Sequence, residues 1–145
     1  MVSQMVKKEN VTRILEVFDR ISKVFASMES FAGDLSLSKP ELLALEAISN
    51  LEGLKMSELA GRLEIGMSTA TGIIDRLIEK KLVLREKNGT DRRVVRIVLT
   101  GRGKKTNLVY QKQKKEIFQK MLSQINTDEQ KSFILILEKI SNALE

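Results

Sequence analysis

The chain contains no cysteine and no histidine among its 145 residues, and these two absences exclude several kinds of chemistry. Without cysteine there is no disulfide, no thiolate nucleophile and no thiol redox switch. Without histidine the commonest general base and the commonest neutral metal ligand are missing. A Cys/His zinc site is impossible, and the scattered acidic residues form no calcium-loop pattern. We therefore expect no catalytic residues, no enzyme activity, no cofactor and no metal.

Proline occurs once, tryptophan is absent, and long hydrophobic runs are missing. Because Ala, Leu, Ile, Glu and Lys are common instead, the composition is typical of a mainly helical protein. No stretch approaches the roughly 20 apolar residues of a membrane span, and charged residues from Lys7 to Glu9 interrupt any signal-like segment. The sequence predicts a cytoplasmic protein with no membrane partner and, at this length, a single domain over residues 1–145.

The net charge of +6 is concentrated in one part of the chain. Between Lys55 and Lys105, thirteen residues are Lys or Arg and six are Asp or Glu. A localised basic segment is typical of a protein that binds a polyanion. The alternative is a solvated, lysine-rich surface, and the charge by itself does not separate the two.

Apolar residues at steps of three and four predict a long first helix from about residue 4 to residue 30. A break at 33–37 follows. Ser38, Pro40 and Glu41 then predict a second helix start, since Ser38 can cap the helix, Glu41 can complete a capping box, and proline is tolerated in the first turn. This helix ends near residues 50–53.

Two short helices come next, joined by a tight turn at 64–66. Ser57 can cap the first of them, and the second runs from about Ser68 to Lys80. Two short helices joined by a three-residue turn containing glycine match the helix-turn-helix pattern. The residues of the second helix that we expect to face inward are Ala70, Ile73, Ile74 and Leu77.

The hydrophobic period then changes from 3.6 to 2, which predicts strands at 82–86 and 94–99. Asn88 and Gly89 favour a hairpin between them, with an exposed and mostly charged tip at 87–93. Thr100 is a plausible cap for a further long helix whose middle, residues 111–116, is polar all round. Thr127 to Gln130 reads as a capping box for the last helix.

The terminal helices carry more apolar surface than a small central domain can cover. This favours a second copy of the chain related by a two-fold axis, whereas the alternative is that the helices pack only on their own chain. Residues 38–100 are then a DNA-binding lobe with a winged helix-turn-helix, and residues 1–32 with 101–145 are a helical dimerisation lobe.

In a helix-turn-helix the second helix enters the major groove with its N-terminal residues at the base edges. The hydroxyl groups of Ser68, Thr69 and Thr71 can reach phosphates or bases. Gly72 costs about 1 kcal/mol relative to alanine inside a helix, which suggests close approach either to DNA or to another helix. Arg76 can reach a phosphate or pair with a carboxylate. Ser57 completes the candidate contacts of the helical part.

The more specific indication of DNA binding is the run Asp91, Arg92 and Arg93. An arginine on a narrow β-ribbon fits the minor groove, where the negative potential is enhanced over A-tracts. Asp91 is an odd neighbour for DNA unless it holds an arginine by a bidentate pair. The alternative is a solvated surface ion pair worth less than about 1 kcal/mol.

From Ser57 to Gly103 the sequence resembles the MarR family (multiple antibiotic resistance regulators). The matching pieces are Ser68-Thr69 with Asp75-Arg76-Leu77, Lys80-Lys81-Leu82-Val83 with Arg85, Asp91-Arg92-Arg93, and Leu99-Thr100-Gly101-Arg102-Gly103 for the family's Leu-Thr-x-x-Gly. The resemblance implies a winged helix-turn-helix homodimer that binds double-stranded DNA at a pseudo-palindromic operator, usually as a repressor associated with the nucleoid. It also implies release by a small lipophilic or phenolic effector, whose contact residues are unknown, and roles for Arg93 in the minor groove and Asp91 as its orienting partner.

The sequence departs from the family's pattern at two positions. Lys81 stands where the family usually has glycine, so it is strained if that site needs a left-handed backbone. Gly72 stands where the family often has arginine. The alternatives to a sequence-specific regulator are a sequence-tolerant architectural DNA-binding protein and a winged-helix module for protein interaction.

Overall fold

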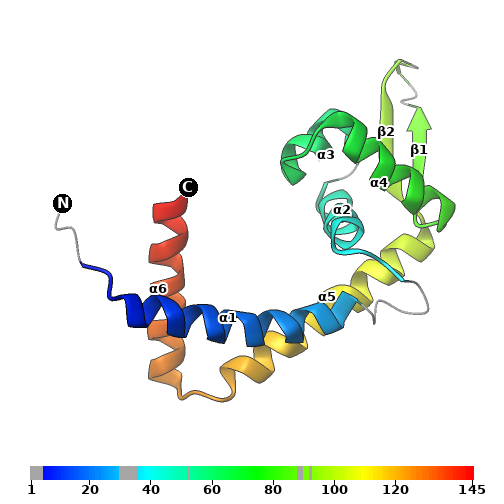
Figure 1. The fold of residues 1–145 in the computed structure, drawn as a ribbon. Helices are drawn as coiled ribbons and strands as arrows, with labels where there is room; N and C mark the ends of the chain where they lie inside the picture. Colours follow the sequence, from blue (N-terminus) through cyan, green and yellow to red (C-terminus); the bar gives the residue numbers. More distant parts are fainter. Residues whose placement is uncertain (1–4, 30–35, 52, 88–89, 92) are drawn as a thin grey trace. The chain divides into compact units, whose positions relative to one another are not determined.

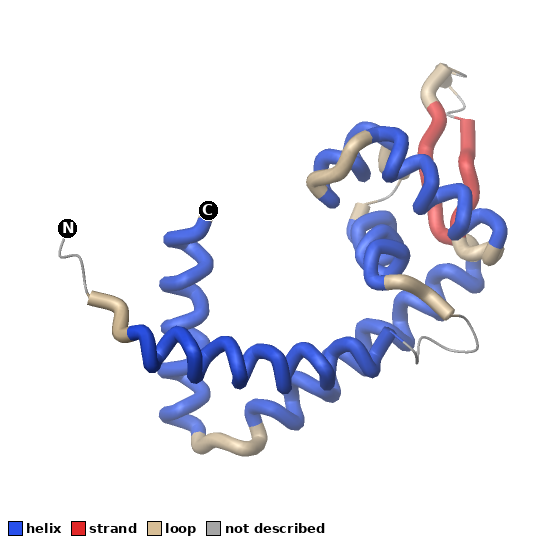
Figure 2. Tube along the Cα trace, in the orientation of Figure 1, coloured by secondary structure: helices blue, strands red, loops and turns tan. Residues whose placement is uncertain are grey.

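The computed structural model describes residues 5–29, 36–51, 53–87, 90–91 and 93–145. Its elements in chain order are the helices α1 (Lys8–Glu29), α2 (Lys39–Asn50), α3 (Met56–Leu63) and α4 (Met67–Glu79), the strands β1 (Val83–Lys87) and β2 (Val95–Leu99), and the helices α5 (Gly101–Leu122) and α6 (Thr127–Leu144) (Figures 1 and 2). The chain forms two compact units, Met1–Tyr110 and Gln111–Glu145. The predicted fold class, mainly helical with a small antiparallel hairpin, is confirmed.

The core of the first unit lies between α2, α3, α4 and the hairpin. The four residues of α4 that were predicted to face inward are all buried. They pack with leucines from α2 and α3 and with residues at the base of the hairpin. The core includes Leu42, Leu45, Leu59, Ile74, Leu77, Leu82, Val83 and Ile97. One contiguous apolar cluster therefore holds the helix-turn-helix and the hairpin together.

The helices α2 and α3 are capped differently at their N-terminal ends. At α2 the predicted capping box is present, because the Ser38 N–H donates to Glu41 Oε2 over 2.7 Å and the Glu41 N–H donates to Ser38 Oγ over 3.4 Å. At α3 the predicted cap was wrong. Lys55 occupies the cap position and its backbone N–H donates to Glu58 Oε2, so Ser57 lies inside the first turn with an exposed side chain.

The turn between α3 and α4 reverses the chain through Glu64, which has φ 54°. The Ile65 N–H donates to the Ala60 carbonyl oxygen and closes the end of α3. Gly66 has φ −70°, so the glycine of this turn does not supply the left-handed conformation. It is instead the residue from which α4 starts.

A second left-handed residue, Lys81 with φ 60°, ends α4 and aims the chain into β1. The strain expected for this position is therefore present, since left-handed backbone costs about 1–2 kcal/mol for a residue with a Cβ. The Leu82 N–H donates to the Leu77 carbonyl oxygen, which closes the helix end. The strands begin one residue later than predicted and pair from Val83 with Leu99 to Lys87 with Val95.

The hairpin also pairs with the segment between α2 and α3. Leu54 forms an isolated antiparallel bridge to Ile97, with the Ile97 N–H donating to the Leu54 carbonyl oxygen over 2.7 Å. This third backbone pairing was not predicted. Asn88 and Gly89, which predicted the turn, lie outside the described residues.

Thr100 and Gly103 fix the start of α5 against the end of α4. Thr100 Oγ1 accepts from the Gly103 N–H over 2.9 Å and donates to the Lys81 carbonyl oxygen over 2.7 Å. The predicted cap at Thr100 is therefore confirmed. A methyl group on Gly103 would lie 2.0 Å from the Leu82 carbonyl oxygen, so the contact between α5 and the α4–β1 turn requires glycine.

At the second unit the predicted capping box was displaced by one residue. Asn126, not Thr127, caps α6, because Asn126 Oδ1 accepts from the Glu129 N–H over 2.9 Å and Glu129 Oε1 accepts from the Asn126 N–H over 3.1 Å. No helix in the described ranges combines the length and the apolar character that a membrane crossing requires.

An ion cluster around one buried carboxylate joins the start of α2 to the end of α4. The Glu41 side chain is only 3% exposed. Lys80 Nζ lies 3.0 Å from both carboxylate oxygens and also donates to the Ser36 carbonyl oxygen over 2.8 Å. Arg76 Nε lies 3.4 Å from Glu41 Oε1. We name these three side chains, Glu41, Arg76 and Lys80, the Glu41 cluster.

Burial by itself would raise the pKa of the Glu41 carboxyl group. The hydrogen bonds from the Ser38 N–H and the Lys80 ammonium group, together with the charge of Lys80, outweigh burial, and this pKa lies below its usual value. The carboxylate is therefore held in its charged form inside the unit. A charge at such depth is tolerated only because hydrogen bonds and cations surround it.

The close contact at Gly103 predicts a difference between two glycines of the same helix. We expect Gly103→Ala to lower the free energy of unfolding by about 2 kcal/mol or more, because the added methyl group meets the Leu82 carbonyl oxygen and α5 must shift. Gly101→Ala is the matched control, since a Cβ there meets nothing within 4 Å. Urea unfolding measures both, and equal stability of the two variants would contradict the contact.

The Glu41 cluster predicts a specific dependence of stability on pH. Because the pKa of Glu41 is lower in the folded chain than in the unfolded chain, the stability it contributes is present above the unfolded-state pKa and is lost as the pH falls through the folded-state pKa. Between about pH 6 and pH 3 we expect the free energy of unfolding to fall more steeply for the unmodified protein than for Glu41→Gln.

Urea titrations followed by circular dichroism at several pH values measure this difference. Glu79→Gln removes an exposed carboxylate from α4 and should keep the steep fall of the unmodified protein. Parallel curves for the unmodified protein and Glu41→Gln would show that the cluster does not stabilise the fold through its charge.

Candidate nucleic-acid interface

The first turn of α4 exposes hydroxyl groups and backbone N–H groups together. The side chains of Ser68 and Thr69 are exposed, and Gly66 at the cap position has no side chain to occupy the helix end. The first α4 residue to donate within the helix is Ala70, whose N–H bonds to the Gly66 carbonyl oxygen. No acidic residue lies in this turn. The positive end of the helix dipole is therefore uncovered, which favours an anion.

Thr71 is placed differently from its two neighbours. Its side chain is half-buried, and Thr71 Oγ1 donates to the Met67 carbonyl oxygen over 2.8 Å. The hydroxyl hydrogen is thus used within the helix, while the oxygen keeps a lone pair. Thr71 can accept a hydrogen bond from a ligand at this surface but is not set to donate one.

Gly72 lies one helical turn after Ser68 on the same face of α4. A methyl group on this residue would lie 3.7 Å from Arg76 Nη1, and no atom of another helix in the described residues comes within 4 Å. The interpretation that glycine is needed here for close helix packing was therefore wrong. What occupies the space above Gly72 is the guanidinium group of Arg76, four residues later on the same helix.

Arg76 has the carboxylate partner that was one of its two predicted contacts. Its Nε lies 3.4 Å from Glu41 Oε1, yet its side chain remains 54% exposed. A single guanidinium group can pair through one nitrogen and present the others outward. The pairing with Glu41 therefore leaves phosphate contact by Arg76 as an open prediction.

A second ion pair links α4 to the β1–β2 hairpin, which is the wing of the winged helix-turn-helix. Arg85 Nη2 of β1 lies 2.8 Å from Asp75 Oδ1 of α4, and both side chains are partly exposed. Such an exposed pair is worth little in stability. Its geometric effect is to link the outer surface of α4 with the first strand of the hairpin, so the two elements present their basic residues from one unit.

The tip of the hairpin carries Asp91 and Arg93. The described contact between them is that Asp91 Oδ1 accepts from the Arg93 backbone N–H over 3.0 Å, while the Val94 N–H donates to the Asp91 carbonyl oxygen. The predicted bidentate pair with a guanidinium group is not what the structure shows at Arg93. Asp91 instead shapes the backbone turn from which the exposed Arg93 side chain leaves. Arg92 lies outside the described residues.

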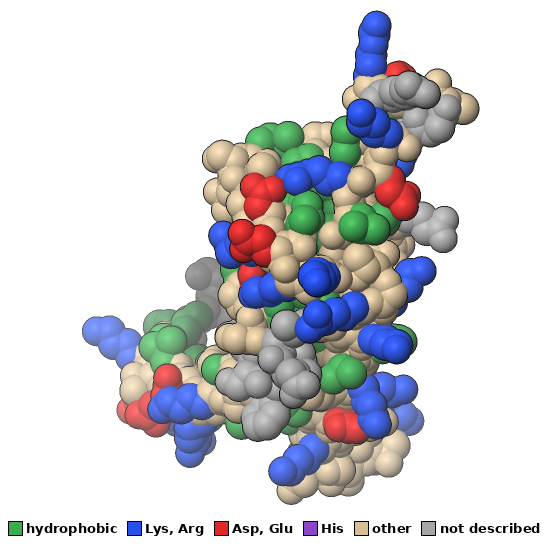
Figure 3. Space-filling view, turned by 90° about the vertical axis from the view of Figure 1, so that its right-hand side faces the viewer, with side chains coloured by type: hydrophobic (Ala, Val, Ile, Leu, Met, Phe, Trp, Pro, Cys, Tyr) green, Lys and Arg blue, Asp and Glu red, His purple; other side chains and the backbone are tan. Residues whose placement is uncertain are grey.

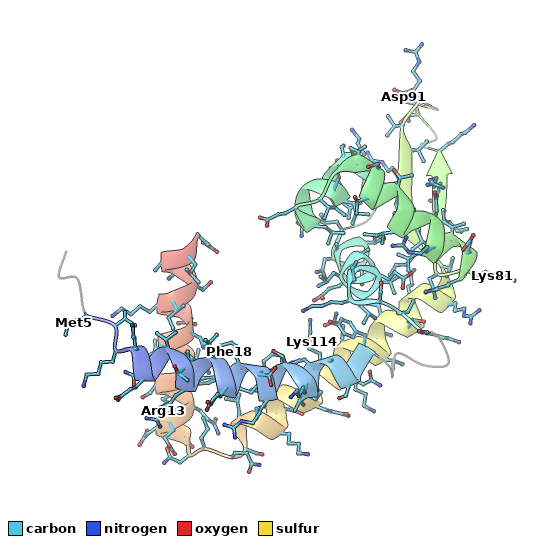
Figure 4. All side chains as sticks on the ribbon, viewed as in Figure 1. Met5, Arg13, Phe18, Lys81, Asp91 and Lys114 are labelled. Atoms are coloured by element: carbon cyan, nitrogen blue, oxygen red, sulfur yellow. The ribbon has the colours of Figure 1, made fainter. Side chains whose placement is uncertain are left out.

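The hairpin tip extends beyond the helices of its own unit, with Asp91 at its end (Figures 1 and 4). Lys and Arg side chains lie at this tip and continue, mixed with carboxylates, on the face below it (Figure 3). Ser57 lies on α3 with an exposed side chain. The described candidate residues are thus carried by α3, α4 and the hairpin of one compact unit.

Sequence reasoning missed the Glu41 cluster. Glu41 was interpreted as a capping residue, which it is, but its burial and its contacts with Arg76 and Lys80 depend on how α2 crosses α4. Glu41 lies far from Arg76 and Lys80 in the sequence, so no local pattern marks the cluster. Within the described ranges, no group of three or more Asp or Glu residues is arranged to hold a metal ion.

A cavity of about 820 Å³ opens elsewhere on the same unit. Its apolar wall consists of Ile48 of α2, Val98 and Leu99 of β2, and Leu108 of α5. Charged side chains of both signs, including Glu86 and Lys104, complete the lining. Its size is within the range of small-molecule sites in proteins.

Comparison with known proteins agrees with this arrangement. The family model described as "MarR family" matches residues 37–95. In Bacillus subtilis strain 168, the uncharacterized HTH-type transcriptional regulator YpoP is 31% identical over 74% of this chain and 76% of its own length. The HTH-type transcriptional repressor MdtR of the same organism is 32% identical over 72% of this chain and 68% of its own length.

Among solved structures, a variant of S. aureus MepR bound to an oligodeoxyribonucleotide superimposes with a TM-score of 0.64. It is 20% identical and covers 97% of this chain and 100% of its own chain, so the likeness is one of fold. The helix-turn-helix, the wing and the identity to these two regulators over most of their length show that the chain belongs to the MarR family of DNA-binding transcriptional regulators and is not an enzyme.

Proposed function

We propose that this regulator is a repressor that binds a pseudo-palindromic operator as a homodimer. The observation that carries the proposal is that an uncapped, hydroxyl-bearing helix start and a basic hairpin tip project from one rigidly packed unit. A helix of this kind fits the major groove, and a narrow basic ribbon fits the adjacent minor groove.

In the major groove we place Ser68, Thr69 and Thr71, with Gly72 allowing the backbone to approach the DNA closely. The exposed hydroxyl groups of Ser68 and Thr69 can donate to phosphate or base acceptors, whereas Thr71 accepts. Ser57 on α3 and Arg76 on α4 contact the backbone phosphates on either side of this groove. Phosphate contacts orient the protein on the duplex, while the contacts in the groove supply its sequence preference.

In the minor groove we place Arg93, and Arg92 beside it. The turn that Asp91 makes with the Arg93 backbone limits the directions in which the Arg93 side chain can leave the hairpin. Less conformational entropy is then lost when the guanidinium group enters the groove. This gives Asp91 an orienting role that works through the backbone.

The homodimer is supported by the exposure of the terminal helices. No residue of α6 is buried, although apolar residues recur along it at helical spacing. The apolar side chains of α1 at Val11, Ile14, Leu15 and Phe18 are exposed as well. The described residues of the chain therefore leave the apolar face of α6 largely exposed. A second copy covers such a face most simply, and residues 1–32 with 101–145 are the dimerisation lobe in this proposal.

Repression is proposed because the relative MdtR is named a repressor. Release from DNA by a small lipophilic or phenolic effector is proposed from the same family resemblance. The cavity beside the hairpin has room for such a molecule, and its lining by β2 and α5 would let an occupant act on the base of the wing.

Selection of duplexes from a random pool tests sequence-specific binding. We expect the unmodified protein to enrich an inverted repeat with half-sites about one helical turn apart. We expect Arg93→Ala to weaken binding to that duplex by more than about tenfold, since it removes a minor-groove contact worth about 1–3 kcal/mol. Fluorescence anisotropy at fixed ionic strength measures the change in Kd.

Lys105→Ala is the charge-matched control for Arg93→Ala, because it removes one cation from the exposed side of α5 and should change the affinity little. Enrichment of no motif, with uniform binding to all duplexes, would support the architectural alternative. Absence of any duplex binding would support the protein-interaction alternative.

The exposed face of α6 predicts that charges placed on it separate the subunits. We expect the double variant Ile136→Glu with Ile140→Glu to be monomeric and to lose binding to the enriched duplex, because two buried carboxylates would face an apolar interface. Light scattering after size exclusion measures the mass. Asn142→Glu, on the other side of α6, should remain dimeric. A monomeric unmodified protein would contradict the homodimer.

A further inference from the structure

Three residues of α4 and the residue that caps its C-terminal end form one row along the helix surface. Ser68, Gly72, Arg76 and Lys80 are spaced by four, and residues at that spacing are neighbours on a helix. The row starts at the exposed helix tip and ends at Lys80, which bonds the buried Glu41. It therefore runs from the proposed DNA-facing surface to the ion cluster under the helix.

Within this row the Arg76 side chain points back toward Gly72. Side chains on a helix lean toward its N-terminus and cover the preceding turn. The distance of 3.7 Å from Arg76 Nη1 to a methyl group built on Gly72 shows that the guanidinium group follows this direction. A methyl group at residue 72 would be in ordinary van der Waals contact with Nη1, whereas a longer side chain would compete with the guanidinium group for the space beside it.

Glu41 holds the other side of the same guanidinium group. Its Oε1 lies 3.4 Å from Arg76 Nε, while its two oxygens accept from Lys80. One carboxylate faces two cations, so the cluster keeps a net positive charge. The buried Glu41 is fixed by the Ser38 N–H and by Lys80, and it provides a rigid anchor for an arginine that is otherwise 54% exposed.

We propose that Glu41 is a positioning residue for DNA binding, which anchors Arg76 so that its guanidinium group stands over Gly72 and contacts a phosphate beside the major groove. The inference rests on the proposed function. It assigns to a buried acidic residue a role in binding a polyanion, although Glu41 itself touches no DNA. It also gives the small residue at position 72 a purpose, since a side chain longer than that of alanine would compete with the guanidinium group for its position.

For the loss of the Glu41 charge, long-range electrostatics predicts the opposite change in DNA affinity to the one that this proposal predicts. Removal of a carboxylate makes the protein more positive and, through long-range charge alone, should tighten DNA binding. Loss of the anchor should weaken it, because the Arg76 side chain then loses its fixed direction. Whether Glu41→Gln tightens or weakens DNA binding therefore distinguishes the long-range charge effect from loss of the anchor.

The test uses the duplex that the unmodified protein enriches from the random pool. We expect Arg76→Ala and Glu41→Gln each to weaken binding about five- to tenfold and to lower the slope of log K against log salt by about one, as loss of a single phosphate contact does. In the Arg76→Ala background, Glu41→Gln should add less than about a twofold change, because its effect passes through Arg76.

Glu79→Gln is the matched control, since it neutralises an exposed carboxylate on the same helix and should leave binding unchanged or slightly tighter. All variants are compared at a temperature where urea unfolding shows that each is folded. Unchanged or tighter binding by Glu41→Gln overturns the inference, and so does an equal loss in the Arg76→Ala background, which indicates a displaced helix instead of a lost anchor.

The Arg93→Ala variant separates this result from failure of the proposed function. If Arg93→Ala weakens binding and Glu41→Gln does not, the positioning role is wrong and the regulator function stands. If the unmodified protein enriches no duplex, the proposed function itself is wrong.

Discussion

The position of the recognition helix, α4, depends on the bonds that the buried and ionised Glu41 side chain makes. It lies at the start of α2, it is buried, and it bonds the end of α4 through Lys80. A buried carboxylate without partners would cost several kcal/mol, so α2 and α4 must keep the arrangement that supplies them. The same bond network reaches the Ser36 carbonyl oxygen, and in this way the segment before α2 is joined to the helix that we place in the major groove.

A second constraint lies at the other side of the unit, where α4 passes into the wing. Lys81 adopts a left-handed conformation, Thr100 bonds its carbonyl oxygen, and Gly103 allows α5 to touch Leu82. The three contacts join the end of α4, the base of the hairpin and the start of α5 within a few ångströms. The direction of the wing is consequently set by backbone contacts, which deform less readily than exposed side-chain pairs such as Asp75 with Arg85.

These two constraints explain why the side chains proposed to contact DNA are exposed and yet start from fixed backbone positions. Ser68, Thr69 and Arg93 have few neighbours of their own, but each leaves a backbone that is packed or bonded within one turn. Arg76 shows the principle at a side chain, because a buried carboxylate directs a guanidinium group that faces solvent. Preorganisation of this kind lowers the entropy lost on binding.

The sequence was enough to predict every element, since periodicity and capping are local properties of the chain. It predicted the buried face of α4, the box at Ser38, the cap at Thr100 and the strain at Lys81. It erred at the starts of α3 and α6, where Lys55 and Asn126 occupy the cap positions expected for Ser57 and Thr127. A shift of one or two residues at a helix end changes the local energy too little for a single sequence to decide.

The sequence by itself determined the fold class, the order of the elements, the basic segment and the family, because hydrophobic spacing, charge and a spaced motif can be read along the chain. Only the tertiary structure decided that Glu41 is buried beside two cations, that the Arg76 guanidinium group lies next to Gly72, and that Asp91 accepts a hydrogen bond from the backbone N–H of Arg93. Each of these depends on a distance between atoms whose relative position is set by packing or by the detailed path of a turn, and no pattern of residue types along the chain encodes such a distance.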